Sequence, residues 1–216
     1  MTRWGMAIDL QRCVGCYACT VSCKQVHFLP PGIFWNRIIT TESGKYPSVR
    51  KLTYPVLCNH CSEAACVEVC PTGASSRRED GMVLIDYDNC VGCGYCIMAC
   101  PYKQRTRYEE RKEYFPGQGY TPYEQMAELF FPLKKKTAVK CNFCVEQIDS
   151  GLEKGLIPGV DREATPTCVN ACPTKARVFG DLDESESNVA RLVRERKGEQ
   201  LRPDFGTDPS IYYISY

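Results

Sequence analysis

The sequence predicts an α+β fold of two pseudo-symmetric units, one nested inside the other, with loop insertions. Three observations support this prediction. The sixteen cysteines of the 216-residue chain fall into four groups of four. A Thr-x-Ala turn followed by a short apolar stretch occurs at residues 72–86 and again at 174–181, which indicates an internal repeat. The second and third groups are close in sequence, so the first and fourth are left to meet across the chain.

The third cysteine group has the most informative spacing. Cys90, Cys93, Cys96 and Cys100 follow the pattern C-x-x-C-x-x-C-x-x-x-C, with Pro101 next. Bacterial ferredoxins have this spacing, in which three cysteines hold one [4Fe–4S] cluster and the fourth ligates another. A tight loop lets three thiolates converge on one cluster, whereas the fourth, one helical turn further, points away. Each nested unit is therefore predicted to be bacterial-ferredoxin-like and to bind two clusters.

The other three groups are variants of this spacing. The first group matches it but has Lys24 in place of the proline, the second is two residues longer, and the fourth is split by a loop. In this spacing the fourth cysteine of a group ligates the cluster of a partner group. With the first group paired to the fourth and the second to the third, four complete ligand sets result. The predicted sets are set 1, Cys13, Cys16, Cys19 and Cys172; set 2, Cys58, Cys61, Cys66 and Cys100; set 3, Cys90, Cys93, Cys96 and Cys70; and set 4, Cys141, Cys144, Cys168 and Cys23.

Complete sets predict four [4Fe–4S] clusters and no three-iron centre. Disulfides are the first alternative, because an even cysteine count in a secreted chain suggests them. A disulfide framework, however, gives no reason for one repeated spacing followed by proline. Zinc is the second alternative, since Cys-x-x-Cys pairs are its usual ligands. Zinc knuckles use separated pairs, whereas here the third and fourth cysteines crowd the same loop.

Composition and charge narrow the class of protein. Hydrophobic residues make up 44% of the chain, enough for a packed core. The formal net charge of +1 counts every thiol as neutral. Metal-bound thiols are deprotonated, and sixteen thiolates offset by four oxidised cores of charge +2 would bring the loaded protein to about −7. This balance gives nucleic-acid binding no support. Lys103 and Arg105 either offset charge near a cluster or are ordinary surface residues.

Three further residues are candidates for tuning or shielding the clusters. His60, between Cys58 and Cys61, either donates a hydrogen bond to cluster sulfur and raises the reduction potential, or is merely packed or exposed. Tyr17 and Tyr95 are taken to occupy matching positions between the second and third cysteines of their groups, where they shield clusters rather than relay electrons.

The predicted boundaries follow the cysteine groups. Residues 1–55 and 141–182 form the outer ferredoxin-like unit, and 56–102 the inner unit. Residues 103–140 are an aromatic-rich insertion, either a flap over the clusters or a docking surface. Residues 183–216 are a C-terminal helix and tail.

Local patterns predict individual elements. Strands are expected at 6–10, 82–86 and 177–181, with a hairpin turn at Asp80-Gly81. A helix from about 187 to 197 has Asp183 or Ser185 as its cap, and the tail is expected to wrap a surface.

No segment predicts export, a membrane span or catalysis by the chain itself. The N-terminus lacks a long apolar core and a twin arginine, and no apolar run approaches the ~20 residues of a span. Export or anchoring would then depend on a partner. No nucleophile and base are arranged for catalysis, so the chain is expected to be a non-catalytic component.

The order of the groups and two later motifs resemble a known family. After the split fourth group come Gly-Asp-Leu-Asp at 180–183 and Gly-Thr-Asp-Pro at 206–209, the latter before Tyr-Tyr-Ile at 212–214. Together with the cysteine groups, these motifs resemble the four-cluster iron–sulfur (beta) electron-transfer subunit of dimethyl sulfoxide reductase superfamily molybdoenzymes. Polysulfide, thiosulfate, arsenate and dimethyl sulfoxide reductases are the most similar types. The resemblance covers nearly the whole chain.

The resemblance implies partners, a location and an electron path. It implies a large catalytic subunit with a molybdenum or tungsten bis-pyranopterin cofactor, and a quinone-linked membrane anchor or a cytochrome. The clusters would form a wire, with that of set 1 nearest the catalytic subunit. Cys96 stands where nitrate reductase relatives have tryptophan, which argues against that branch.

Two points remain open from the sequence. The implied location is periplasmic, by co-export with a partner that carries a twin-arginine signal, and the alternative is cytoplasmic. For the function, the alternatives are a polyferredoxin-like subunit of a hydrogenase, formate or carbon monoxide oxidoreductase system, and a zinc-stabilised interaction module.

Overall fold

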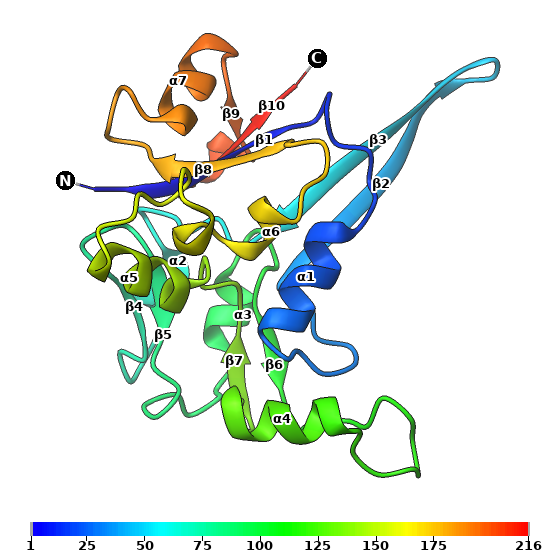
Figure 1. The fold of residues 1–216 in the computed structure, drawn as a ribbon, viewed down its shortest axis with the longest axis vertical. Helices are drawn as coiled ribbons and strands as arrows, with labels where there is room; N and C mark the ends of the chain where they lie inside the picture. The colour runs from blue at the N-terminus through cyan, green and yellow to red at the C-terminus, as the bar shows by residue number, and fades with distance from the viewer. Residues whose placement is uncertain (1, 216) are drawn as a thin grey trace.

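The computed structural model describes residues 2–215 and centres on a four-stranded sheet (Figure 1). The sheet has the order β8-β1-β10-β9. Its strands are β1 Trp4–Asp9, β8 Arg177–Asp181, β9 Glu199–Gln200 and β10 Ile211–Ile214. β1 is parallel to β10 and antiparallel to β8, and β9 is antiparallel to β10. Segments from the two ends of the sequence therefore form one sheet.

β1 is buried along its whole length because strands flank it on both sides and both of its faces are covered. Ala7 packs with Val189 and Ile214 beneath α7, Asn188–Glu195. Met6 and Ile8 belong to the main hydrophobic core on the opposite face. Alternate residues of one strand thus serve two packed layers, as the period of two requires.

The C-terminal strand contradicts the expected surface tail. β10 pairs with β1 from Met6↔Ile211 to Asp9↔Ile214, and Ile211 and Ile214 are fully buried. The side chains of Ile211 and Tyr213 enter the main core. Pairing with β1 satisfies the backbone groups of this segment and removes its apolar side chains from water. The tail is therefore a structural part of the sheet.

Three antiparallel two-stranded sheets complete the strands, of which the first two are hairpins and the third joins strands on either side of the insertion. They are β2 Asn36–Lys45 with β3 Ser48–Leu57, β4 Ser75–Arg77 with β5 Val83–Ile85, and β6 Thr106–Tyr108 with β7 Thr137–Val139. The β2–β3 ribbon projects from the body (Figure 1). The predicted turn at Asp80-Gly81 is confirmed, because Gly81 has a φ of 83° and Asp80 accepts from the Met82 amide.

Short helices follow or carry the cysteine groups. They are α1 Ala18–Val26, α2 Ala65–Glu68, α3 Tyr95–Ala99, α5 Val145–Glu153 and α6 Thr167–Asn170. Two 3₁₀ turns lie at Arg162–Ala164 and Pro203–Phe205. Within residues 2–215, every helix is too short or too polar to cross a bilayer.

The helix predicted near the C-terminus is α7, but its cap differs from the prediction. The Ser187 side chain accepts from the Ala190 amide at 3.1 Å, so neither Asp183 nor Ser185 is the N-cap. The helix ends at Glu195, before the predicted stop. Ser187 is the residue in extended conformation directly before the first helical turn, which is the geometry of an N-cap.

The aromatic-rich insertion packs against the segment that follows α1. It contains α4, Pro122–Phe130, which begins with a capping box between Thr121 and Glu124. The Tyr114 hydroxyl donates to the Leu29 carbonyl at 2.8 Å, and Phe131 meets the ring of Trp35 edge-on. Leu129 and Phe130 remain mostly exposed. The insertion therefore covers α1 with one face and presents an apolar outer face.

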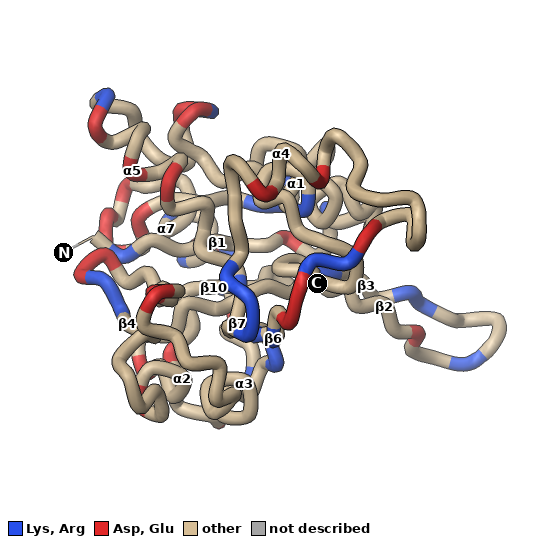
Figure 2. The backbone as a smooth tube through the Cα atoms, turned by 90° about the horizontal axis from the view of Figure 1, so that it is seen from below, with Lys and Arg blue, Asp and Glu red and all other residues tan. Residues whose placement is uncertain are grey.

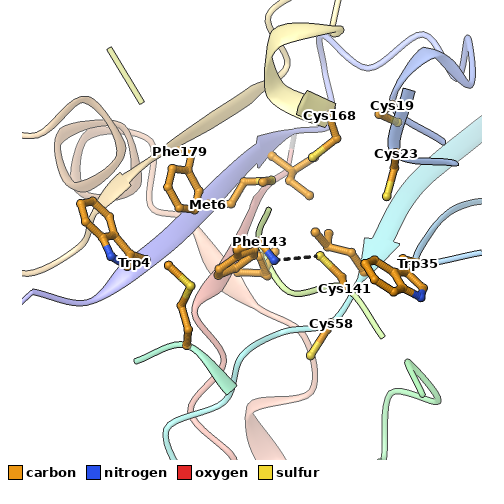
Figure 3. Close-up of a cluster of buried hydrophobic side chains, with 14 of the residues drawn as sticks. Trp4, Met6, Cys19, Cys23, Trp35, Cys58, Cys141, Phe143, Cys168 and Phe179 are labelled. Carbon is orange, nitrogen blue, oxygen red and sulfur yellow. Dashed lines mark hydrogen bonds between the residues drawn. The ribbon is translucent and has the colours of Figure 1, made fainter. Parts of the chain in front are cut away.

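Charged residues are spread over the molecule. In Figure 2, acidic and basic residues alternate along the exposed loops rather than gathering on a face of one sign. The interior contrasts with this surface, because the main hydrophobic core contains five cysteines (Figure 3). They are Cys19, Cys23, Cys58, Cys141 and Cys168.

Candidate metal centres

Sets 1 and 3 each surround a cavity. The four cysteines of set 1 line a small cavity where the loop before α1 meets the end of α6. The four cysteines of set 3 line a similar small cavity between the loop before α3 and the turn that follows α2. In each case the fourth thiol comes from the distant group that the sequence analysis paired with it.

A glycine makes the turn of each of these two loops. Gly15 and Gly92 both have a φ of 67°, a conformation that side chains disfavour. A Cβ atom at Gly92 would lie 1.7 Å from the carbonyl oxygen of Lys136, so the position has no room for a side chain. At Gly15 the nearest atom would be a side-chain carbon of Thr53 at 3.1 Å.

The thiols of sets 2 and 4 lie deeper, and within each set they raise one another's pKa. Burial raises the pKa of Cys61 to about 12, with Cys58, Cys66 and Cys100 raising it as well. Burial likewise raises the pKa of Cys23 well above its usual value, and Cys141, Cys168 and Cys144 add to this. The structure therefore brings together the members of these two sets too. Thiols with raised pKa values stay protonated unless a bound metal takes the place of the proton.

Shared neighbours show the spatial order of the sets. Arg177 lies beside Cys168 of set 4 and Cys19 of set 1, and Arg105 lies beside Cys66 of set 2 and Cys96 of set 3. Cys58 of set 2 is close enough to raise the pKa of Cys141 of set 4. The order is therefore set 1, set 4, set 2, set 3. Each end set has an exposed cysteine, whereas all four of set 4 are buried.

The buried arginines compensate the sulfur charges. Burial acts to lower the pKa of Arg177, but Cys168 and Cys19 more than offset this, so that pKa lies above its usual value. One guanidinium nitrogen of Arg177 lies 3.7 Å from the Cys168 sulfur, and the other donates to Asn36 at 3.0 Å. Arg105 donates to the Ser75 hydroxyl at 2.6 Å. A buried cation between two groups of thiolates lowers the cost of their negative charge.

His60 lies between the second and fourth groups. Its Nδ1 accepts a hydrogen bond from the Val83 amide at 3.0 Å, so the proton of the neutral ring is on Nε2. The ring stacks on Phe143 with 3.7 Å between centroids. Burial, followed by the charge of Lys140, holds the pKa of His60 well below its usual value. His60 is therefore an uncharged donor, and the sequence alternative of an exposed ring is wrong.

These surroundings fit an iron–sulfur cluster. Sulfur atoms of Cys70 and Cys172 each accept a backbone N–H at 3.3 Å, from Ser75 and Ala176. Within residues 2–215, Nε2 of His60 and two nitrogens of Arg105 are buried and have no hydrogen-bond partner. Cluster sulfides accept hydrogen bonds, so they would satisfy such donors. In the same part of the chain, no three metal-binding side chains converge on one point, and the thiols instead surround hollow volumes.

Comparison with known proteins agrees with this chemistry. Residues 49–116 match the 4Fe-4S dicluster domain family, and residues 4–25 match the 4Fe-4S binding domain family. An iron–sulfur protein assigned to a dimethyl sulfoxide reductase of Halobacterium salinarum is 40% identical over all of this chain and 80% of the relative. The arsenate respiratory reductase iron-sulfur subunit ArrB of Shewanella sp. (strain ANA-3) is 37% identical over 98% of this chain and 96% of the relative. A sulfite dehydrogenase subunit of Allochromatium vinosum is 38% identical over 99% and 83%. The chain belongs to the iron–sulfur subunits of the dimethyl sulfoxide reductase superfamily.

Family membership confirms the resemblance drawn from the sequence. It also confirms [4Fe–4S] chemistry and electron transfer in anaerobic respiration as the class of function. The two domain matches of this iron–sulfur subunit contain the first, second and third cysteine groups, whereas the split fourth group lies outside both.

The structure corrects one expectation about this iron–sulfur subunit and decides between two alternatives for another residue. Tyr17 and Tyr95 do not occupy matching positions. Tyr17 is the left-handed residue before α1, and its counterpart before α3 is Gly94. Each tyrosine is about half exposed, at 49% and 54%, so neither is tucked beneath its loop. Arg105 is buried rather than on the surface, whereas Lys103 is exposed.

Sequence reasoning missed Arg177, His27 and Lys140. Arg177 follows the Cys-Pro turn of the fourth group directly, which is a signal that spacing could have provided. Lys140 is buried and donates to the carbonyl oxygens of Cys141 and Val83, and no local pattern indicates this. His27 is four residues beyond Cys23, and only the folded chain places it against Cys144.

Proposed function

We propose that this chain relays single electrons through four [4Fe–4S] clusters held by sets 1 to 4. The relay would run between a catalytic subunit with a molybdenum or tungsten bis-pyranopterin cofactor and a quinone-linked membrane anchor or a cytochrome. The chain itself performs no substrate chemistry, and the pterin belongs to the partner alone. The bound clusters supply the one-electron chemistry.

The spatial order of the thiol sets carries this proposal. Four sets in the order 1, 4, 2, 3, with exposed cysteines only in the two end sets, form a path with two accessible ends and an insulated middle. Such a path suits transfer between two partners better than storage at one site. The chain's residues hold the thiolates, offset their charge through Arg105 and Arg177, and exclude water from set 4.

The residues around the sets would tune the potentials. The Nε2–H of His60 is buried without a protein partner within residues 2–215, and as a donor to cluster sulfur it would raise the reduction potential. Tyr17 and Tyr95 cover part of the loops of sets 1 and 3 and are proposed to limit the access of water there.

Exposed apolar residues beside both end sets support two docking partners. Val14 and Tyr17 flank the exposed Cys16, while Val91 and Met98 lie near the exposed Cys93. Apolar and aromatic side chains are typical of interface cores. By the resemblance, set 1 faces the catalytic subunit, so set 3 would face the membrane-linked or cytochrome partner. We place the complex in the periplasm, by co-export with a catalytic subunit that carries a twin-arginine signal.

Metal analysis of the native complex tests this proposal. We expect anaerobically purified complex to contain about sixteen irons and sixteen sulfides per chain, and a pterin-binding subunit to co-purify. Dithionite reduction should give interacting [4Fe–4S] signals in low-temperature EPR. About eight irons, or a three-iron signal in the intact oxidised protein, would show that the ligand sets are wrong.

A further inference from the structure

His27 is the other histidine of the chain, which has two. It follows α1 and is buried, with Nε2 3.3 Å from the Cys144 sulfur of set 4. Its ring contacts Trp35 at 4.6 Å and meets Phe131 edge-on at 5.4 Å between centroids. Within residues 2–215, the Cys144 sulfur is the one hydrogen-bond partner of this ring, and Nδ1 has none.

The partner of His27 decides which nitrogen holds the proton. A metal-bound cysteine is a thiolate, which accepts hydrogen bonds but cannot donate them. Nε2 must therefore be the donor, and Nδ1 of the uncharged ring carries the lone pair. The aromatic surroundings favour an uncharged ring, because a buried charge without a partner is costly. His60 has its proton on the same nitrogen for an independent reason, its acceptance of the Val83 amide.

We propose that His27 raises the reduction potential of the cluster held by set 4 by donating a neutral N–H···S hydrogen bond to Cys144. This inference rests on the proposed function, since it requires a cluster at set 4. A cluster bound there would carry more negative charge on its sulfur atoms when reduced. The hydrogen bond from His27 would therefore be stronger in the reduced state, and His27 would keep its proton in both states. No bond is formed or broken.

The position of set 4 explains why such a donor is needed. All four of its cysteines are buried, so water contributes little to stabilising added charge there. Arg177 supplies one cation, which it shares with set 1. Without a further donor, set 4 would have a low potential and would form a barrier between its neighbours. His27 acts on set 4 alone and so adjusts this step without changing the others.

Potentiometric EPR on the anaerobically purified complex tests the proposal, with iron content measured first. We expect His27→Leu to lower the reduced-to-oxidised ratio of one cluster about tenfold at a fixed potential, which is about 59 mV for one electron. His27→Gln keeps an N–H and should retain most of the wild-type ratio. Phe131→Leu, the matched control, changes the packing around the ring but removes no hydrogen-bond donor, and should shift nothing. The other three signals should be unchanged in all variants.

Other results would overturn the inference. Equal shifts in His27→Leu and His27→Gln, or a shift in Phe131→Leu, would show that packing rather than donation matters. No shift in His27→Leu would show that the bond does not act on the potential. A second measurement needs no variant: ¹⁵N-histidine labelling of the native complex should give a hyperfine coupling on the set 4 signal, and its absence would also overturn the inference. Fewer than four clusters in the wild type would instead refute the proposed function.

Discussion

A buried arginine lies between the thiols of sets 1 and 4, and a second one lies between the thiols of sets 2 and 3. The two arginines come from different positions relative to their cysteine groups. For sets 1 and 4, Arg177 comes from the strand directly after the Cys-Pro turn and reaches the Cys168 sulfur itself. For sets 2 and 3, the corresponding position after the turn is Ser75, and the cation is Arg105 from beyond the third group. Ser75 therefore has the sequence position that corresponds to Arg177, and its hydroxyl accepts a hydrogen bond from Arg105.

Both pairs of sets have a buried positive charge between their thiols, but the arginine that supplies it comes from a different position in the sequence in each pair. Two pairs of thiol groups need a cation between them, because burial raises the cost of the thiolates. The guanidinium of Arg177 finds its partners within the protein, because it donates to Asn36 and contacts the Cys168 sulfur. The guanidinium of Arg105 has two nitrogens without protein partners within residues 2–215. The second pair should therefore depend more on its clusters for stability.

The largest effect is expected from Gly92→Ala in set 3, with Gly15→Ala in set 1 as its counterpart. At Gly92 the new Cβ would lie 1.7 Å from a backbone oxygen, so the loop must move, beyond the cost of about 1–2 kcal/mol of a left-handed alanine. At Gly15 a side chain can yield. We expect Gly92→Ala to lose the iron of set 3 and Gly15→Ala to keep it, as measured by iron content and thermal unfolding. Equal iron losses would mean that the two loops are equally tight.

Removal of either arginine should affect one pair of sets only. Arg177→Met should lower the potentials of sets 1 and 4, and Arg105→Met those of sets 2 and 3, because each leaves thiolates without their cation. Each should also cost about 3–5 kcal/mol of stability, the usual penalty for breaking a buried ion pair. EPR potentiometry and denaturant unfolding measure both quantities.

The matched control for the arginines is Arg107→Met, which removes an exposed arginine paired with Glu109, two residues beyond Arg105. It should cost less than about 1 kcal/mol. If Arg177→Met moved all four potentials, the division into two pairs would not hold.

Metal removal should distinguish the ends of the path from its middle. We expect a chelator with mild oxidant to remove the clusters of sets 1 and 3 several times faster than that of set 4, because Cys16 and Cys93 are exposed and all of set 4 is buried. The EPR signals, followed in time, give the order of loss. Set 2 should be intermediate, since only Cys58 of its four thiols is buried. Loss of all four signals at one rate would indicate global unfolding rather than access.

The smallest effect is expected from Ser187→Ala. Ser187 caps the helix that covers the sheet beside Ala7, and loss of an N-cap costs about 1 kcal/mol. Ser185→Ala is the control and should change the free energy of unfolding by less than about 0.5 kcal/mol. Neither change should alter any cluster signal. A destabilisation by Ser185→Ala as large as that by Ser187→Ala would contradict the observed cap.

Sequence patterns predicted the elements that are formed by residues close together in the chain. The hairpin at Asp80-Gly81 and the strand at 177–181 were predicted because turn chemistry and apolar runs are local. The four ligand sets stay a prediction from the ferredoxin spacing, which contains the rule for the crossed fourth cysteine.

The features that were missed depend on contacts between distant segments. The tail from Leu201 contains prolines and glycine and has the composition of a surface segment, yet β10 completes the sheet because β1 needs a second partner. His27 and Arg105 are polar residues in ordinary sequence surroundings, and their burial follows from the insertion and the hairpins packed around them. No periodicity in the sequence indicates such contacts.

The pairing of β1 with β10 sets the timing of maturation during synthesis. Residues 4–9 are synthesised about 200 residues before their parallel neighbour, residues 211–214. Residues 207–210 also fasten the loop of the second cysteine group, through the Ser62, Glu63 and Ser210 amides and the Ser210 hydroxyl. The thiol groups can therefore reach their final positions only after residue 214 has been translated. Assembly of the complete set of sixteen thiols accordingly follows the synthesis of all four cysteine groups rather than accompanying it group by group.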